Sequence, residues 1–251
     1  MSFVETLVLG TVAGLTIFLG LPIARLRVLT PRYLSFLSSF AVGVLLFLFV
    51  DIVEHAAAPV EDAIKAGDSA TATPLLAVIV IGFLTGLLSL VYYGRRALAT
   101  HNAPSSIAML VATGLGLHNF SEGLAIGASA SKGEIALALT LVVGFGLHNL
   151  TEAFGIAAPL VGQRVSWGFL ASAGLIAGGP NFLGTLLGYG FSSDLVSVGF
   201  LALAAGALAF VIGELFAAGR RLTEPIWSGW GIGLGFLAGL LTDFILVAVG
   251  A

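Results

Sequence analysis

Residues 106–161 read SIAMLVATGLGLHNFSEGLAIGASASKGEIALALTLVVGFGLHNLTEAFGIAAPLV, and this stretch decides the fold of the chain. Two apolar runs, each long enough to cross the ~30 Å hydrocarbon core of a bilayer as a helix, flank a short polar break at 132–134. Each run contains one copy of a pattern, GLHNFSEG at 116–123 and GLHNLTEA at 146–153. The stretch therefore predicts a helical hairpin through a membrane, with one copy of the pattern in each arm.

Each copy places a histidine and a glutamate at positions i and i+4, namely His118 with Glu122 and His148 with Glu152. On a helix this spacing puts the two side chains about 40° apart around the axis and one turn apart along it. Both histidines lie fifteen residues from Gly133, so we expect them at equal depth, about 22 Å from the same membrane surface. Ionisable groups at such depth are costly and indicate function. The four groups are predicted to form one shared site or two adjacent ones.

Asn119 and Asn149 follow the two histidines, and we expect their amide oxygens at the edge of the same cleft. The chain has no cysteine, and nitrogen and oxygen donors without a thiolate favour borderline divalent ions over Cu⁺ or Ca²⁺. One His–Glu pair would be compatible with a structural hydrogen bond between helices. Two matched pairs favour a cation site instead.

The composition is that of a polytopic membrane protein, because 58% of the 251 residues are hydrophobic and only 9% are charged. A soluble domain carries about 25% charged residues. No basic cluster of the kind that binds nucleic acid is present. Stretches of roughly 20 apolar residues predict eight membrane spans, at Val4–Ala24, Leu34–Val53, Pro74–Tyr93, Ser106–Ala130, Ile135–Val161, Trp167–Tyr189, Leu195–Ala218 and Ile226–Val249.

Lysines and arginines divide unevenly between the two ends of this all-α bundle. Eight of the ten fall in the loops after spans one, three, five and seven, namely Arg25, Arg27, Arg32, Arg95, Arg96, Arg164, Arg220 and Arg221. The other end has Lys65 and Lys132, with a polar loop predicted at His55–Thr73. Basic residues mark the cytoplasmic side, so both termini are predicted to be extracytoplasmic. Residues 1–251 are predicted to form one transmembrane domain of the plasma (inner) membrane, with the lipid bilayer as partner.

Several segments together resemble the ZIP family of divalent metal transporters: HNFSEG and HNLTEA, the eight-span layout, Gly179-Pro180 before GTLLG at 184–188, and the GEL segment at 213–215. The resemblance covers essentially the whole chain. It implies transport of a divalent metal ion into the cytoplasm, zinc first, with iron, manganese, cobalt, nickel or cadmium as alternatives. The metal would be the substrate and not a prosthetic group, the chain would not be an enzyme, and a homodimer is often formed.

The resemblance also implies roles for single residues. His118 and Glu122 match ligands of a first metal site, Glu152 matches a carboxylate shared by two sites, and Asn119 matches a ligand of the second. His148 matches the family's histidine on span five.

Three departures from the family pattern concern the metal sites. Ser121 and Thr151 stand where the family usually has a proline before each glutamate. Asn149 occupies a position that is commonly acidic, and Gly179 stands where a glutamate is expected on span six. The second site is therefore short of negative charge, and we expect one well-occupied metal per protomer.

Five further polar residues are candidates for an accessory role. Asp51 and His55 share a face of span two and, with Glu54, could form an external entry site for metal. The alternative is that span two ends there and these residues are simply solvated. Asp243 lies inside span eight, where a carboxylate needs a partner, a water-filled path or protonation. Asn181 could line the cleft in place of the missing glutamate.

Two other function classes would use the same groups. An intramembrane metalloenzyme would use a metal-bound water, but the chain has no HExxH signature. A proton- or cation-coupled carrier of an organic solute would use the histidines and glutamates as a proton relay. No P-loop motif is present, so transport driven by ATP on this chain is not predicted.

Overall fold

The computed structural model describes residues 1–26, 30–100, 103–190, 193–219 and 224–248. Every regular element within them is a helix, in the order α1 (Phe3–Leu15), α2 (Ile17–Gly20), η1 (Leu21–Arg25), α3 (Pro31–Lys65), α4 (Ser69–Thr100), α5 (Ala103–Ser131), α6 (Ile135–Ala157), η2 (Ala158–Leu160), α7 (Trp167–Gly190), α8 (Asp194–Gly219) and α9 (Pro225–Ala248). Outside the described residues lie Arg27, His101, Arg220 and Arg221, and also the side chains of Arg95 and Arg96.

Helices occupy all eight apolar stretches predicted from the sequence. The first stretch is divided, because the α-helical ladder of α1 breaks at Thr16, whose amide and hydroxyl both bond to the Ala13 carbonyl, at 3.4 and 2.7 Å. Seven of these helical segments in the described residues are long and apolar enough to cross a membrane. The exception is α5, whose hydropathy is lowered by the polar pattern that it carries.

The prediction of a loop at His55–Thr73 is wrong for most of that range. Helix α3 continues to Lys65 and α4 begins at Ser69. The last turns of α3 are exposed, and Lys65 Nζ lies 3.4 Å from Glu61 Oε2 and 3.8 Å from Asp62 Oδ1. Such pairs support a helix in water. Gly67 then turns the chain with φ at 71°, a conformation that glycine adopts without steric penalty. An exposed polar helix and a polar loop have similar compositions, so the composition of this segment could not distinguish them.

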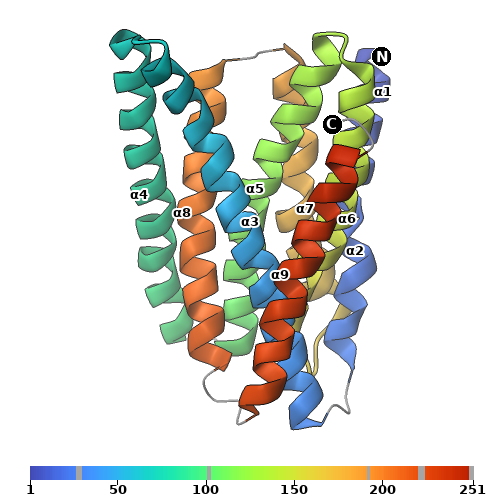
Figure 1. Cartoon of the computed structure of the whole chain (residues 1–251). Helices are drawn as coiled ribbons and strands as arrows, with labels where there is room; N and C mark the ends of the chain where they lie inside the picture. The colour runs from blue at the N-terminus through green and yellow to red at the C-terminus, as the bar shows by residue number, and fades with distance from the viewer. Residues whose placement is uncertain (27–29, 101–102, 191–192, 220–223, 249–251) are drawn as a thin grey trace.

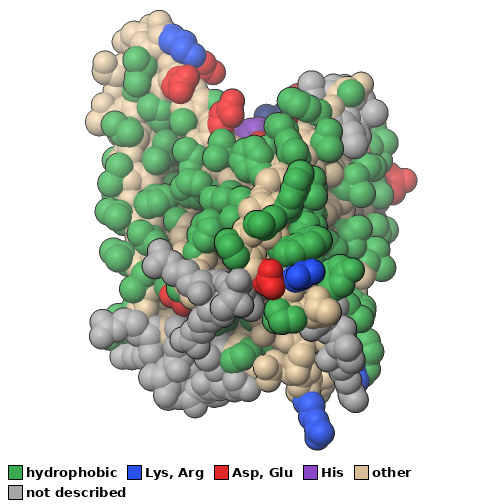
Figure 2. Space-filling view, turned by 60° about the horizontal axis from the view of Figure 1, so that its bottom comes forward, with side chains coloured by type: hydrophobic (Ala, Val, Ile, Leu, Met, Phe, Trp, Pro, Cys, Tyr) green, Lys and Arg blue, Asp and Glu red, His purple; other side chains and the backbone are tan. Residues whose placement is uncertain are grey.

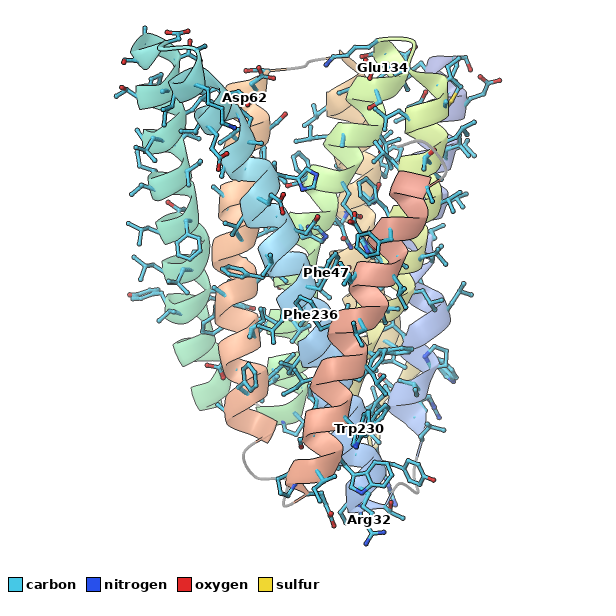
Figure 3. All side chains as sticks on the ribbon, viewed as in Figure 1. Arg32, Phe47, Asp62, Glu134, Trp230 and Phe236 are labelled. Atoms are coloured by element: carbon cyan, nitrogen blue, oxygen red, sulfur yellow. The ribbon has the colours of Figure 1, made fainter. Side chains whose placement is uncertain are left out.

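The start of α1 and the end of α9 lie at one end of the bundle, as do the α3–α4 and α5–α6 turns (Figure 1). Figure 3 shows Asp62 and Glu134 at this end and Arg32 and Trp230 at the opposite end. The hairpin of α5 and α6 is flanked on both sides, since α5 packs against α7 and α8 while α6 packs against α1, α2 and α3. Next to it, α3 packs against α8 and α9, and α4 packs mainly against α8. The two copies of the polar pattern are thereby enclosed by other helices.

Glycines bring the backbones of α5 and α7 into contact. A Cβ on Gly123 of α5 would overlap the Asn181 carbonyl, and a Cβ on Gly184 of α7 would overlap the Phe120 carbonyl. Small residues allow such close approach in lipid, where burial of apolar surface gives little drive to association. This contact fixes the first copy of the pattern against α7.

We expect Gly184→Ala to lower the stability of the bundle by about 1–3 kcal/mol, the usual cost of overpacking a close contact. Gly179→Ala is the matched control on the same helix, because a Cβ there meets nothing within 4 Å. Thermal unfolding in detergent should therefore show a lower midpoint for Gly184→Ala and an unchanged or slightly higher one for Gly179→Ala. Equal midpoints for the two variants would contradict the packing described here.

Candidate functional site

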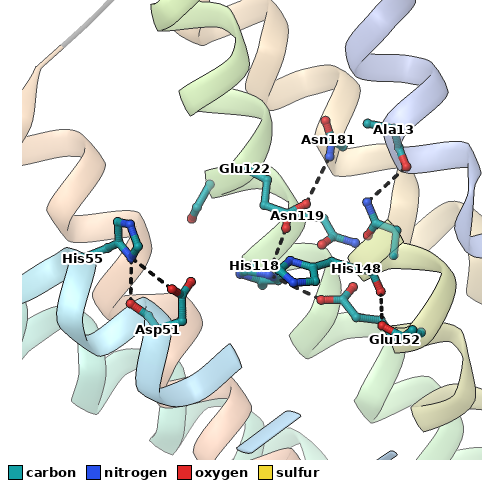
Figure 4. A network of polar contacts seen from close by, with 12 residues as sticks. Ala13, Asp51, His55, His118, Asn119, Glu122, His148, Glu152 and Asn181 are labelled. Atoms are coloured by element: carbon teal, nitrogen blue, oxygen red, sulfur yellow. Dashed lines mark hydrogen bonds and ion pairs between the residues drawn. The ribbon is translucent and has the colours of Figure 1, made fainter. Parts of the chain in front are cut away.

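The two copies of the pattern meet in the interior of the bundle, as Figure 4 shows. His118 Nε2 lies 3.2 Å from Glu122 Oε1, one turn further along α5, and 3.4 Å from Glu152 Oε1 on α6. All three side chains are buried, with residue exposures of 4%, 4% and 1%. His148 is equally buried and lines the cavity beside them. Residues thirty apart in the sequence thus form one polar centre.

Asn119 and Asn149 cross-link the two motif helices to their neighbours. Asn119 Nδ2 donates to the Ala177 carbonyl of α7 at 3.0 Å, and Asn149 Nδ2 donates to the Ala13 carbonyl of α1 at 3.1 Å. The second acceptor is the carbonyl at the α1 break, which also accepts from the amide and the hydroxyl of Thr16. In both asparagines the amide nitrogen is used for this bond, and Oδ1 has no hydrogen-bond partner among the described residues.

The side chain that α7 contributes to the centre is Asn181. It is completely buried, and its Nδ2 donates to Glu122 Oε2 at 3.4 Å. Gly179, where the resemblance leads one to expect a glutamate, lies two residues earlier and therefore about 160° away around the helix. A Cβ at Gly179 would meet nothing within 4 Å. A carboxylate at that position would start on the opposite face of α7.

Unpartnered polar atoms concentrate at this centre. Ten buried side-chain nitrogen and oxygen atoms of the described residues have no hydrogen-bond partner, and nine of them belong to His118, Asn119, Glu122, His148, Asn149, Glu152 and Asn181. Folded proteins leave few such atoms, and each one is costly when nothing replaces the lost water. Six of the nine are carboxylate or amide oxygens, which present lone pairs. Together they suit a cationic ligand.

A cavity of about 360 Å³ reaches this centre from one side. Its titratable lining residues come from four helices and are His118, Glu122, His148, Asp51, His55 and Asp243. In α3, His55 Nδ1 lies 2.9 Å from the Asp51 carbonyl oxygen and 3.4 Å from Asp51 Oδ1, and the His55 side chain is 66% exposed. Figure 2 shows acidic and histidine side chains gathered in a hollow of the protein surface. Glu54 is exposed and does not line the cavity.

In the described ranges, no group of three or more His, Cys, Asp or Glu side chains is arranged to hold a metal ion as it stands. At the centre the donors contact one another directly. The chain matches no protein-family model and no curated protein. The metal site and the resemblance to the ZIP family therefore stay predictions.

Proposed function

We propose that this chain is a multi-pass carrier of the plasma (inner) membrane that moves divalent transition-metal ions, zinc first, into the cytoplasm. The observation that supports this most directly is the triad of His118, Glu122 and Glu152, in which one imidazole nitrogen lies within 3.4 Å of carboxylates from two helices. Ionised carboxylates buried among membrane helices need a partner of opposite charge. No lysine or arginine of the described residues lines this cavity, so a bound cation is the group that would supply the charge.

The separations within the triad suit a small tetrahedral ion. Zinc binds imidazole nitrogen and carboxylate oxygen at about 2.0–2.2 Å, which puts neighbouring ligand atoms of a tetrahedron about 3.3–3.6 Å apart. The contacts of 3.2 and 3.4 Å are close to this range, so small side-chain rotations would make room for an ion between the donors. An amide oxygen of Asn119 or Asn181 would complete the set. The same ligands admit iron, manganese, cobalt, nickel or cadmium.

The cavity suggests a route for the ion to this site. Asp51, His55 and Asp243 line its wall together with His118, and the exposed His55 with the partly buried Asp51 would meet the hydrated ion first. We assign these two residues and Asp243 to an entry position. Glu54 adds negative charge nearby without lining the cavity. The ion would then exchange its remaining waters for the buried donors.

The direction of transport depends on which end of the bundle faces the cytoplasm. Among the described residues, Arg25 ends η1, Arg32 lies in the first turn of α3 and Arg164 lies between η2 and α7, all at one end of the bundle. Lys65 and Lys132 lie at the α3–α4 and α5–α6 turns, at the other end. This distribution favours eight spans with both termini extracytoplasmic. The homodimer implied by the resemblance stays a prediction.

A labelling experiment tests the orientation. Cysteines introduced by Asp68→Cys or Lys132→Cys should react with a membrane-impermeant thiol reagent in intact cells, whereas Thr30→Cys should react only after permeabilisation. All three positions are exposed, and the native chain has no cysteine to interfere. The reverse labelling pattern would invert the topology and, with it, the proposed direction of uptake.

Transport itself can be tested with purified protein in liposomes that contain a chelating dye. We expect a dye signal on external addition of Zn²⁺ and weaker or comparable signals with the other divalent ions listed above. Protein-free liposomes and an Asp51→Asn, His55→Gln double variant, which should slow entry and leave the triad in place, serve as controls. A protein that passes no metal ion, but takes up an organic solute with protons or shows hydrolytic activity, would contradict the proposal.

A further inference from the structure

A second cavity, of about 360 Å³, lies at the end of the bundle opposite the α3–α4 and α5–α6 turns. Its lining residues are Arg25, Gln163, Arg164, Val165 and Ser166, none of which lines the cavity at the triad. This volume is far above the roughly 10–15 Å³ of such space that one water molecule needs, and it is enough for a phosphate group and the polar atoms attached to it.

Two backbone segments form this second cavity. The residue after η1 is hydrogen-bonded to the connection between η2 and α7. The Gly162 amide donates to the Leu26 carbonyl at 3.2 Å. Arg25 Nη1 donates to the Val165 carbonyl at 3.1 Å. The Arg25 guanidinium also lies over the Trp167 ring, at 4.6 Å from its centroid. These contacts hold one guanidinium at the wall of the cavity.

The lining has two positive charges and no carboxylate. Among the described residues, neither Arg25 nor Arg164 forms an ion pair, whereas Arg32 at the same end lies 3.8 Å from Glu224 Oε1. Ser166 Oγ already accepts from the Phe169 amide and caps α7. The two guanidinium groups are therefore the charged donors of this lining, with the Gln163 amide beside them, and guanidinium matches phosphate oxygens with two parallel hydrogen bonds.

The surroundings of this cavity are those of a membrane surface. Trp167 is 59% exposed and Leu26 is 45% exposed. Trp230, which Figure 3 shows at this same end of the bundle, is 62% exposed. Exposed tryptophans concentrate at the boundary between lipid and water, and basic pockets on the cytoplasmic side of membrane proteins bind anionic headgroups. The phosphate available at this depth belongs to a lipid.

We propose that Arg25 and Arg164 bind the phosphate of an anionic phospholipid in the surrounding leaflet. The lipid would bridge the end of the first span and the connection that leads into α7. This inference requires that the chain lies in a membrane with this end at the cytoplasmic surface, as in the proposed topology, and it does not depend on metal transport. Its failure and the failure of the proposed function are therefore separate outcomes.

Lipid nanodiscs provide the test. The unmodified protein should unfold several degrees higher in nanodiscs with phosphatidylglycerol than in nanodiscs of phosphatidylcholine alone, because a ligand that binds only the folded state stabilises it. Arg164→Gln should lose most of this shift. In phosphatidylcholine alone, the variant should unfold at the same temperature as the unmodified protein, because Arg164 is exposed and its replacement disturbs no packing. Arg32→Gln, which removes a charge at the same end but outside the cavity, should keep the shift. Native mass spectrometry should show one fewer retained phosphatidylglycerol for Arg164→Gln than for Arg32→Gln.

Three results would overturn this proposal. The first is the absence of any shift with phosphatidylglycerol in the unmodified protein. The second is an equal loss in Arg164→Gln and Arg32→Gln, which would mean a diffuse effect of charge. The third is an equal stabilisation by inorganic phosphate in phosphatidylcholine nanodiscs, which would make free phosphate the ligand.

Discussion

Replacing Glu152 with glutamine is expected to abolish metal uptake while the protein unfolds at the same temperature as before, or at a higher one. The Glu152 residue is 1% exposed, and neither of its carboxylate oxygens has a hydrogen-bond partner in the described residues. Its ion-pair partner among the described residues is His118, at 3.4 Å. Burial of such a carboxylate opposes folding, and glutamine keeps the size of the side chain without its charge. The variant should therefore lose a metal ligand and no stability.

The metal affinity of Glu152→Gln should fall by at least about 100-fold, because even residues that only support a metal ligand contribute 10- to 100-fold. Isothermal titration in detergent measures this affinity, and dye-loaded liposomes measure uptake. Glu134→Gln is the control, since Glu134 is an exposed glutamate directly before α6. Uptake by Glu152→Gln at the rate of the Glu134→Gln control would remove the triad from the proposed mechanism. Loss of uptake together with loss of folding would show that Glu152 has a structural role instead.

The sequence was sufficient to predict the helices and the meeting of the two polar patterns. Eight apolar stretches of helical length have little alternative in a bilayer, where every backbone polar group must be paired within its own helix. The equal distance of His118 and His148 from Gly133 then predicts that the two histidines lie at similar depth. In the structure both line one cavity, and Glu152 from the second pattern reaches His118 of the first.

The cross-links around the centre could not be predicted, because they depend on neighbours that the spacing does not specify. Asn119 and Asn149 were expected to contribute their amide oxygens at the edge of the cleft, whereas their amide nitrogens donate to carbonyls of α7 and α1. The acceptor on α1 lies in the turn where the helix breaks at Thr16, and no proline or glycine at that position signals the break in the sequence. The length of α3 was also missed, since its exposed final turns have the composition of a loop.

Asn181 was only an accessory candidate in the sequence, yet it is the α7 side chain that contacts the triad. Its Nδ2 lies 3.4 Å from Glu122 Oε2, and its Oδ1 has no hydrogen-bond partner among the described residues. This amide pairs with a glutamate and adds no charge. With only two carboxylates in the triad, a second divalent ion a few ångströms from the first would be repelled strongly in a medium of low dielectric constant. The unmodified protein is therefore expected to hold one metal ion per protomer.

Asn181→Asp is expected to change this stoichiometry from one metal ion to two. The substitution replaces the donor beside Glu122 with a second carboxylate at nearly the same separation, so the two groups repel each other until a cation lies between them. With a chelator present, the unfolding temperature should fall by several degrees below that of the unmodified protein, and excess Zn²⁺ should restore it. Elemental analysis and titration calorimetry of the purified variant measure the number of ions. Asn181→Leu, which keeps the volume and removes the polar atoms, should retain one ion and show no metal-dependent recovery beyond that of the unmodified protein. A single ion in Asn181→Asp, with an unfolding temperature that does not respond to the chelator, would mean that position 181 lies outside the reach of the bound metal.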